Sequence, residues 1–119
     1  MALPAPKLSL SDYLTWEYDQ PERHEFFRGD IFAMVGAHRV HGLIAGNLFA
    51  ALELHLKGGP CRAFVAGMKV QVADEAIFYP DVFVTCDADD LKTEMVFRHP
   101  KAIFEVLSDS TQAHDAAGA

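Results

Sequence analysis

The sequence is poor in cysteine. Its 119 residues include only Cys61 and Cys86, and neither belongs to a CxxC pair. The pattern therefore argues against a zinc ribbon or a disulfide framework. Cysteine is often buried, and thiols stay reduced in the cytoplasm, so we expect two free buried thiols.

Basic residues are also scarce. Lys and Arg number 10 against 17 Asp and Glu, so the formal net charge is −7. Domains that bind DNA non-specifically are usually basic, because neutralising phosphates supplies much of their affinity. The acidic balance argues against a large DNA-wrapping surface. It is compatible with a cluster of carboxylates whose charge a bound cation offsets.

Long hydrophobic runs are missing as well. Residues 1–7 do not form a signal peptide, and the helix-like stretch 38–57 contains Arg39, His41 and Glu53, which a membrane span would exclude. The sequence has no Gly-rich phosphate loop, which argues against a nucleotide-hydrolysing motor. We expect a cytoplasmic protein that does not enter a membrane.

The composition is that of a globular protein. Half of the residues are hydrophobic and 23% are charged, and the length suits a single domain over residues 1–119. A core is therefore feasible, since a domain of this size buries roughly two-thirds of its unfolded surface.

The first half of the chain reads as a helix, a hairpin and a second helix. Ser9 can cap a helix whose apolar stripe is Leu10, Tyr13, Leu14 and Tyr18. Strands at 24–28 and 31–35 flank a turn predicted at Gly29-Asp30. The long helix near 38–57 has apolar residues at three- and four-residue steps and ends at Gly58-Gly59-Pro60.

The second half reads mainly as strands. Apolar or alternating segments lie at 61–66, 68–72, 77–85 and 102–107, with Lys69 and Gln71 on the polar side of the second. The acidic run 87–90 is predicted to be a solvated loop. A further helix should begin near Thr111.

This order of elements predicts an α/β (α+β) domain in which helices flank a central mixed β-sheet. The final helical segment stops soon after it starts, so we expect the fold to be incomplete at its C-terminus. Apolar surface left uncovered in this way should favour a homo-oligomer.

Two carboxylates stand out because each interrupts an apolar strand. Asp81 follows Pro80 within the run 77–85, and Glu105 lies within 102–107. A charge in such a place is costly unless something compensates it. Each carboxylate could instead face solvent or pair with an arginine. Together, however, they suggest ligands for Mg²⁺, which prefers oxygen donors and can activate water at a phosphate.

Four blocks of the sequence resemble the Uma-two family of proposed restriction endonucleases, within the PD-(D/E)xK nuclease superfamily. They occur in the family's order and cover the chain from about residue 8 onward. The blocks are RHEFFRGDIFAM (23–34), HGLIAGNL (41–48), YPDV (79–82) and EVLSDST (105–111).

The resemblance implies a restriction-endonuclease-like fold and a metal-dependent endonuclease whose substrate is DNA and whose cofactor is Mg²⁺ or Mn²⁺. Asp81 and Glu105 match the two metal-binding acids of the motif, and Glu25 matches a further acid of the site. His41 and Asn47 match supporting positions on the long helix.

The chain departs from the motif at one position. The motif places Lys two residues after the second acid, where this sequence has Leu107. That Lys orients water and stabilises developing charge. Family members often carry it on the following helix instead, beyond the residue that Asp115 resembles, and the chain ends about there. Lys69 is a candidate substitute; the alternative is an ordinary solvated Lys on a half-exposed strand.

The histidines allow a weaker alternative. His38 and His41 could share a helix face as zinc ligands, but no third ligand stands at a telling spacing. The remaining histidines, His24 among them, read as surface residues. The preferred hypothesis is therefore the endonuclease. The alternative is a non-catalytic remnant of the nuclease fold that acts as an interaction or assembly domain.

Overall fold

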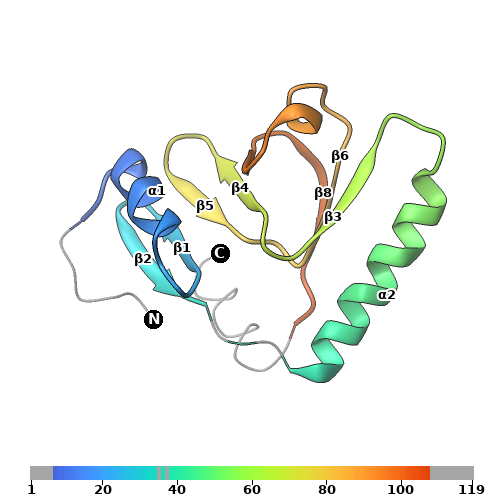
Figure 1. Ribbon diagram of the computed structural model, residues 1–119, viewed down its shortest axis with the longest axis horizontal. Helices are drawn as coiled ribbons and strands as arrows, with labels where there is room; N and C mark the ends of the chain where they lie inside the picture. The colour runs from blue at the N-terminus through green and yellow to red at the C-terminus, as the bar shows by residue number, and fades with distance from the viewer. Residues whose placement is uncertain (1–6, 35, 37, 108–119) are drawn as a thin grey trace.

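A computed structural model describes residues 7–34, 36 and 38–107 (Figure 1). Within these ranges the chain forms two α-helices, one short 3₁₀ helix and eight strands. In chain order the elements are α1 (Leu10–Tyr18), β1 (His24–Phe27), β2 (Asp30–Ala33), α2 (Arg39–Leu56), β3 (Arg62–Val65), β4 (Lys69–Val72), β5 (Ala76–Phe78), β6 (Val82–Thr85), η1 (Asp90–Lys92), β7 (Val96–Phe97) and β8 (Pro100–Phe104). The helix predicted near Thr111 lies outside the described residues.

The mixed α+β class is confirmed, but the strands divide between two sheets. The larger has the order β2-β1-β5-β4-β7 and is mixed, because β4 and β7 run parallel while its other neighbours are antiparallel. The smaller is antiparallel, with the order β3-β6-β8. Phe64 and Phe83 of the smaller sheet pack with Val70 and Phe97 of the larger, so one aromatic core joins the two.

Pro80 explains why the predicted strand 77–85 is two strands. Proline has no N–H for a sheet ladder, so it belongs at a break between paired segments. β5 ends at Phe78 in the larger sheet, and β6 begins at Val82 in the smaller. The connecting segment Tyr79–Asp81 therefore lies where the chain passes from one sheet to the other.

Helix α1 begins as predicted and covers the β1–β2 hairpin (Figure 1). The Ser9 hydroxyl accepts a hydrogen bond from the Asp12 N–H at 3.1 Å, the usual N-cap arrangement. Tyr13 is fully buried against a core that includes Phe26. The predicted stripe is wrong at its end, because Tyr18 is 72% exposed. Glu17, four residues after Tyr13 and so on the same face, is buried instead.

The hairpin turn is offset by one residue from the prediction. β1 pairs with β2 through Phe27↔Asp30, so the two-residue loop is Arg28-Gly29. Both have positive φ, 49° and 91°, as the favoured two-residue hairpin turn requires.

Helix α2 lies at the far end of the molecule from α1, beside β3 (Figure 1). Its predicted start and end are confirmed within a residue or two. The predicted apolar face is only partly buried: Leu48, Leu52 and Leu56 are half-buried, whereas Val40, Leu43 and Ile44 are 57%, 54% and 49% exposed. Neither helix in the described ranges combines the length and apolar character needed to cross a membrane.

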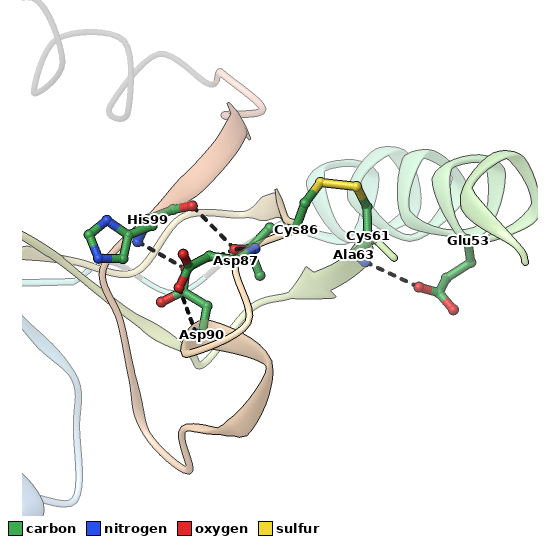
Figure 2. The surroundings of a disulfide bond; sticks show 8 residues. Glu53, Cys61, Ala63, Cys86, Asp87, Asp90 and His99 are labelled. Carbon is green, nitrogen blue, oxygen red and sulfur yellow. Dashed lines mark hydrogen bonds between the residues drawn. A yellow bond between two sulfur atoms is a disulfide. The ribbon is translucent and has the colours of Figure 1, made fainter. Parts of the chain in front are cut away.

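The prediction of free thiols is wrong, because Cys61 and Cys86 form a disulfide (Figure 2). β3 and β6 are antiparallel and pair Arg62 with Thr85. The two cysteines stand one residue beyond that pair, with their Cα atoms 4.1 Å apart. Sequence separation hides this proximity, since only the pairing of two distant strands creates it.

The acidic run 87–90 is only partly the solvated loop that its composition predicts. Asp90 is 3% exposed, and its carboxylate accepts hydrogen bonds from the Thr85 hydroxyl (2.8 Å) and from the backbone N–H groups of Arg98 (2.8 Å) and His99 (2.9 Å). Burial raises the pKa of Asp90, but these hydrogen bonds outweigh it and hold the pKa below its ordinary value. The loop is thereby fixed to β6 (Figure 2).

Candidate active site

Asp81 lies at the junction of the two sheets, just before β6. Its Oδ2 accepts a hydrogen bond from the Val106 N–H at 2.7 Å and lies 3.2 Å from His41 Nε2. The side chains of His41 and Asp81 are 16% and 18% exposed. The backbone carbonyl of Asp81 accepts from the Ala66 N–H at 3.0 Å. Contacts from α2 and from the segment after β8 thus hold the partly buried carboxylate, and a contact from the β3–β4 connection holds the backbone of the same residue.

Glu105 lies just beyond the end of β8, the strand that pairs with β6. β6 and β8 are antiparallel and pair Val82 with Phe104. Asp81 and Glu105 each stand one residue beyond that pair, so their backbones are neighbours at this end of the two strands. Glu105 is exposed, whereas Asp81 is partly buried. The sheet topology therefore brings the backbones of the two predicted acids to one end of the smaller sheet.

Glu25 reaches the same segment from the larger sheet. It lies on β1 and is partly buried, and its Oε2 accepts a hydrogen bond from the Tyr79 N–H at 3.1 Å. The three predicted acids are thus arranged around Tyr79–Asp81, with Glu25 contacting its first residue and Glu105 lying beside its last.

Lys69 is buried, so it is not the solvated side chain that the alternative interpretation of the sequence predicts. It is 8% exposed, and Gln71 beside it is 5% exposed, whereas Val72 is 47% exposed. The simple alternation predicted for this strand is therefore wrong. β4 is an inner strand of the larger sheet, and Lys69 Nζ lies 5.5 Å from the centroid of the Tyr79 ring, which covers it. The one cation proposed for the site is buried against the segment that leads to Asp81.

The supporting residues of α2 are not equally close to the acids. His41 lies on the first turn and faces Asp81. Asn47 is exposed and follows His41 by six residues, which is about 240° around a helix, so it projects from another side. His38 is the N-cap residue of α2 and is exposed. Leu107 is 55% exposed.

The donor chemistry suits a hard divalent cation. Mg²⁺ is commonly bound by one or two carboxylates with waters completing its shell, and Asp81 and Glu105 offer two. Among the described residues no group of three or more His, Cys, Asp and Glu side chains is arranged to hold a metal ion. Both contacts of the Asp81 carboxylate with described residues, to His41 and to the Val106 N–H, are made by Oδ2.

Sequence reasoning missed a buried polar network behind these acids. Glu17 and His24 are 5% and 7% exposed, so the prediction of a surface His24 is wrong. The Tyr79 hydroxyl donates to Glu17 Oε2 at 2.7 Å. Burial raises the pKa of Tyr79, and the hydrogen bond to Glu17 raises it further. The one signal available in the sequence is that Glu17 falls on the helix face occupied by Tyr13.

The fold and these residues define a class, an α+β domain with three carboxylates gathered around the segment that joins its two sheets. Residues 10–117 match the model of the Uma2 family, described as "Putative restriction endonuclease". The chain belongs to this family.

Proteins similar to this chain include two curated proteins and a solved structure. It is 41% identical over 116 residues to the uncharacterised Synechocystis sp. protein slr1290, and 32% identical over 111 residues to sll1609 of the same organism. These alignments cover 97% and 91% of this chain but 61% and 63% of the relatives, so the chain spans less than two-thirds of their length. A crystal structure of a "putative nuclease belonging to DUF820" from Anabaena variabilis has the same fold, with a TM-score of 0.74 at 19% identity, over 93% of this chain and 64% of that one.

Proposed function

We propose that this chain carries the metal-binding part of a DNA endonuclease domain that hydrolyses phosphodiester bonds with Mg²⁺ or Mn²⁺. The observation that supports this most directly is the position of Asp81. It is held at the sheet junction by His41 and the Val106 N–H, and Glu105 directly follows the neighbouring strand β8. Membership of a restriction-endonuclease family agrees with a nuclease-like function.

Asp81 and Glu105 are the proposed metal ligands. Two hydrogen bonds to Oδ2 orient the Asp81 carboxylate, so little conformational freedom remains to be lost on binding. Glu25, which accepts from the Tyr79 N–H, would assist directly or through a water molecule. A bound Mg²⁺ or Mn²⁺ would supply a lowered pKa for an attacking water and charge stabilisation at the scissile phosphate.

Lys69 is the proposed source of positive charge, in place of the Lys that Leu107 replaces. Its ammonium lies against the Tyr79 ring, two residues from Asp81, in a place where water screens charges poorly. A buried cation with a fixed position is the kind of group that stabilises charge developing in a transition state.

The alternative is a non-catalytic nuclease-fold domain that serves interaction or assembly, including homo-oligomers. The half-exposed Val40, Leu43 and Ile44 on α2 favour it, because apolar positions repeated along one helix suit a protein interface. Leu107 at the Lys position of the motif also favours it.

Mn²⁺ titration by calorimetry tests the metal site. Asp81→Asn should weaken Mn²⁺ binding at least tenfold and leave the melting temperature unchanged or higher, because the substitution removes a negative charge that lacks its cation in the apo protein. Asp74→Asn is the matched control, since Asp74 is exposed in the turn between β4 and β5 and loses the same charge. Equal Mn²⁺ affinity for the wild type and Asp81→Asn would remove Asp81 from the site.

Plasmid nicking in Mg²⁺ or Mn²⁺ tests the chemistry. Cleavage should be slow, because Lys69 does not occupy the motif's Lys position, where the sequence has Leu107, and a charge-stabilising donor that is absent or displaced costs up to roughly 10²–10³ in rate. The net charge of −7 also opposes encounter with a polyanion, most strongly at low salt. Residual cleavage should disappear in Glu105→Gln and in Lys69→Met. If neither the wild type nor a full-length relative cleaves DNA with either metal, the non-catalytic alternative is favoured.

A further inference from the structure

We propose that Glu17 is a positioning residue that holds the segment Tyr79–Asp81 in register with Glu25, through hydrogen bonds to His24 and to the Tyr79 hydroxyl. This inference rests on the proposed function for its consequence in metal binding. Its structural part can be tested separately.

Glu17 joins three segments that are distant in sequence. It projects from α1, and both oxygens of its carboxylate are used. Oε2 accepts from the His24 N–H at 2.6 Å and from the Tyr79 hydroxyl at 2.7 Å, while Oε1 lies 2.9 Å from His24 Nδ1. The Glu17 side chain is 2% exposed and that of His24 is 9% exposed. The carboxylate thus connects α1 to the start of β1 and to the junction between the sheets.

Tyr79 is held at both ends. Its hydroxyl donates to Glu17, and its backbone N–H donates to Glu25 at 3.1 Å. Pro80, which follows it, is almost fully buried and has a restricted φ. Asp81 comes next. Little rotational freedom therefore separates the hydroxyl held by Glu17 from the carboxylate proposed to bind metal.

His24 completes the link on the other side. It directly precedes Glu25 on β1, and both its ring and its backbone N–H contact Glu17. Its backbone carbonyl accepts a hydrogen bond from the Tyr13 hydroxyl, so α1 holds this residue at two points. The Glu17 carboxylate therefore fixes His24, which precedes Glu25, and Tyr79, which lies two residues before Asp81.

A purely structural role would not require this arrangement. Apolar side chains at positions 17, 24 and 79 together would fill the same space without the cost of burying a charge. The groups that contact Glu17 belong to the two segments that carry Glu25 and Asp81. Arg23 and Lys69 lie 5.9 and 5.5 Å from the Tyr79 ring centroid, so positive charge surrounds the same segment.

Tyr79→Phe tests the inference, because it removes only the hydroxyl bonded to Glu17. Thr85→Val is the matched control. It also removes a buried hydroxyl bonded to a carboxylate (2.8 Å, to Asp90), but at the opposite end of β6 from Asp81. Both variants should lose similar thermal stability. Glu17→Gln is the more direct test, but it removes a buried charge that contacts three segments. If that variant does not fold, Tyr79→Phe still tests the inference.

The first readout is amide hydrogen exchange without metal. The Tyr79 N–H donates to Glu25 and the Val106 N–H donates to Asp81. Both amides should exchange faster in Tyr79→Phe than in Thr85→Val. Equal exchange in the two variants overturns the positioning role, whatever the function of the protein.

The second readout is Mn²⁺ affinity by calorimetry. Loss of a residue that orients a metal ligand typically weakens binding by about 10–100-fold, which we expect for Tyr79→Phe and not for Thr85→Val. If Asp81→Asn weakens Mn²⁺ binding and Tyr79→Phe does not, the positioning role is wrong and the proposed function stands. If Asp81→Asn binds Mn²⁺ like the wild type, the proposed metal site is wrong, and hydrogen exchange alone decides whether Glu17 orders the segment.

Discussion

Breaking the Cys61–Cys86 disulfide should destabilise the protein substantially. The two cysteines are separated by 25 residues in sequence. Closing a loop of that length in the unfolded chain removes conformational entropy equivalent to about 3.5 kcal/mol at 25 °C. Unfolding free energies of single domains are typically about 5–15 kcal/mol, so the loss would be a large share of the total.

Apart from this entropy, few contributions to the free energy of unfolding should change when the disulfide is reduced. Both cysteines are only partly buried, so water can solvate the reduced thiols. The backbone pairing of β3 with β6, from Arg62↔Thr85 to Val65↔Val82, does not depend on the sulfur atoms. With an unfolding entropy of about 2.1 cal/mol/K per residue, the melting temperature should fall by roughly 14 °C.

Thermal melts with and without a reductant test this prediction, with Cys61→Ser/Cys86→Ser as the control. The double variant should melt at the temperature of the reduced wild type and should not respond to reductant. Thiol titration of the unreduced, denatured wild type should find no free thiol. Two titratable thiols, together with melts that do not depend on reductant, would refute the disulfide and restore the expectation drawn from composition.

Three further changes test other parts of the fold. Asp90→Asn should lower stability by about 1–3 kcal/mol at neutral pH in urea unfolding, because a buried acceptor of several hydrogen bonds loses its charge. The folded pKa of Asp90 lies below its ordinary 3.8, so its contribution is present above 3.8 and is lost as pH falls through the folded pKa. The stability gap between wild type and Asp90→Asn should therefore close only below pH 3.8. Ser9→Ala should lower stability by about 1 kcal/mol, since the Asp12 N–H loses its cap. Ser11→Ala, two residues further on and exposed, should lower it less. Gly29→Ala should cost roughly 1–3 kcal/mol, because φ is 91° and the new Cβ would lie 3.0 Å from the Lys7 side chain; a stability equal to wild type would show that the turn can change its conformation.

The sequence alone determined the features that depend on neighbouring residues. The Ser9 cap, the hairpin near Gly29 and the limits of α2 follow from backbone preferences over a few residues, and the structure departs from them by one or two positions. Asp81 and Glu105 were recognisable as candidates because a carboxylate in an apolar strand is locally anomalous.

Tertiary structure decided the features that depend on distant segments. Pro80 marks a break, but only strand pairing shows that β5 and β6 enter different sheets and leave Asp81 between them. The disulfide has the same origin. Burial of Glu17, Lys69 and Asp90 could not be read from composition, since a charged residue is exposed by default and is buried only where distant groups compensate it. For Glu17 those groups lie 7 and 62 residues away, and local sequence preferences carry no information about contacts at such separations.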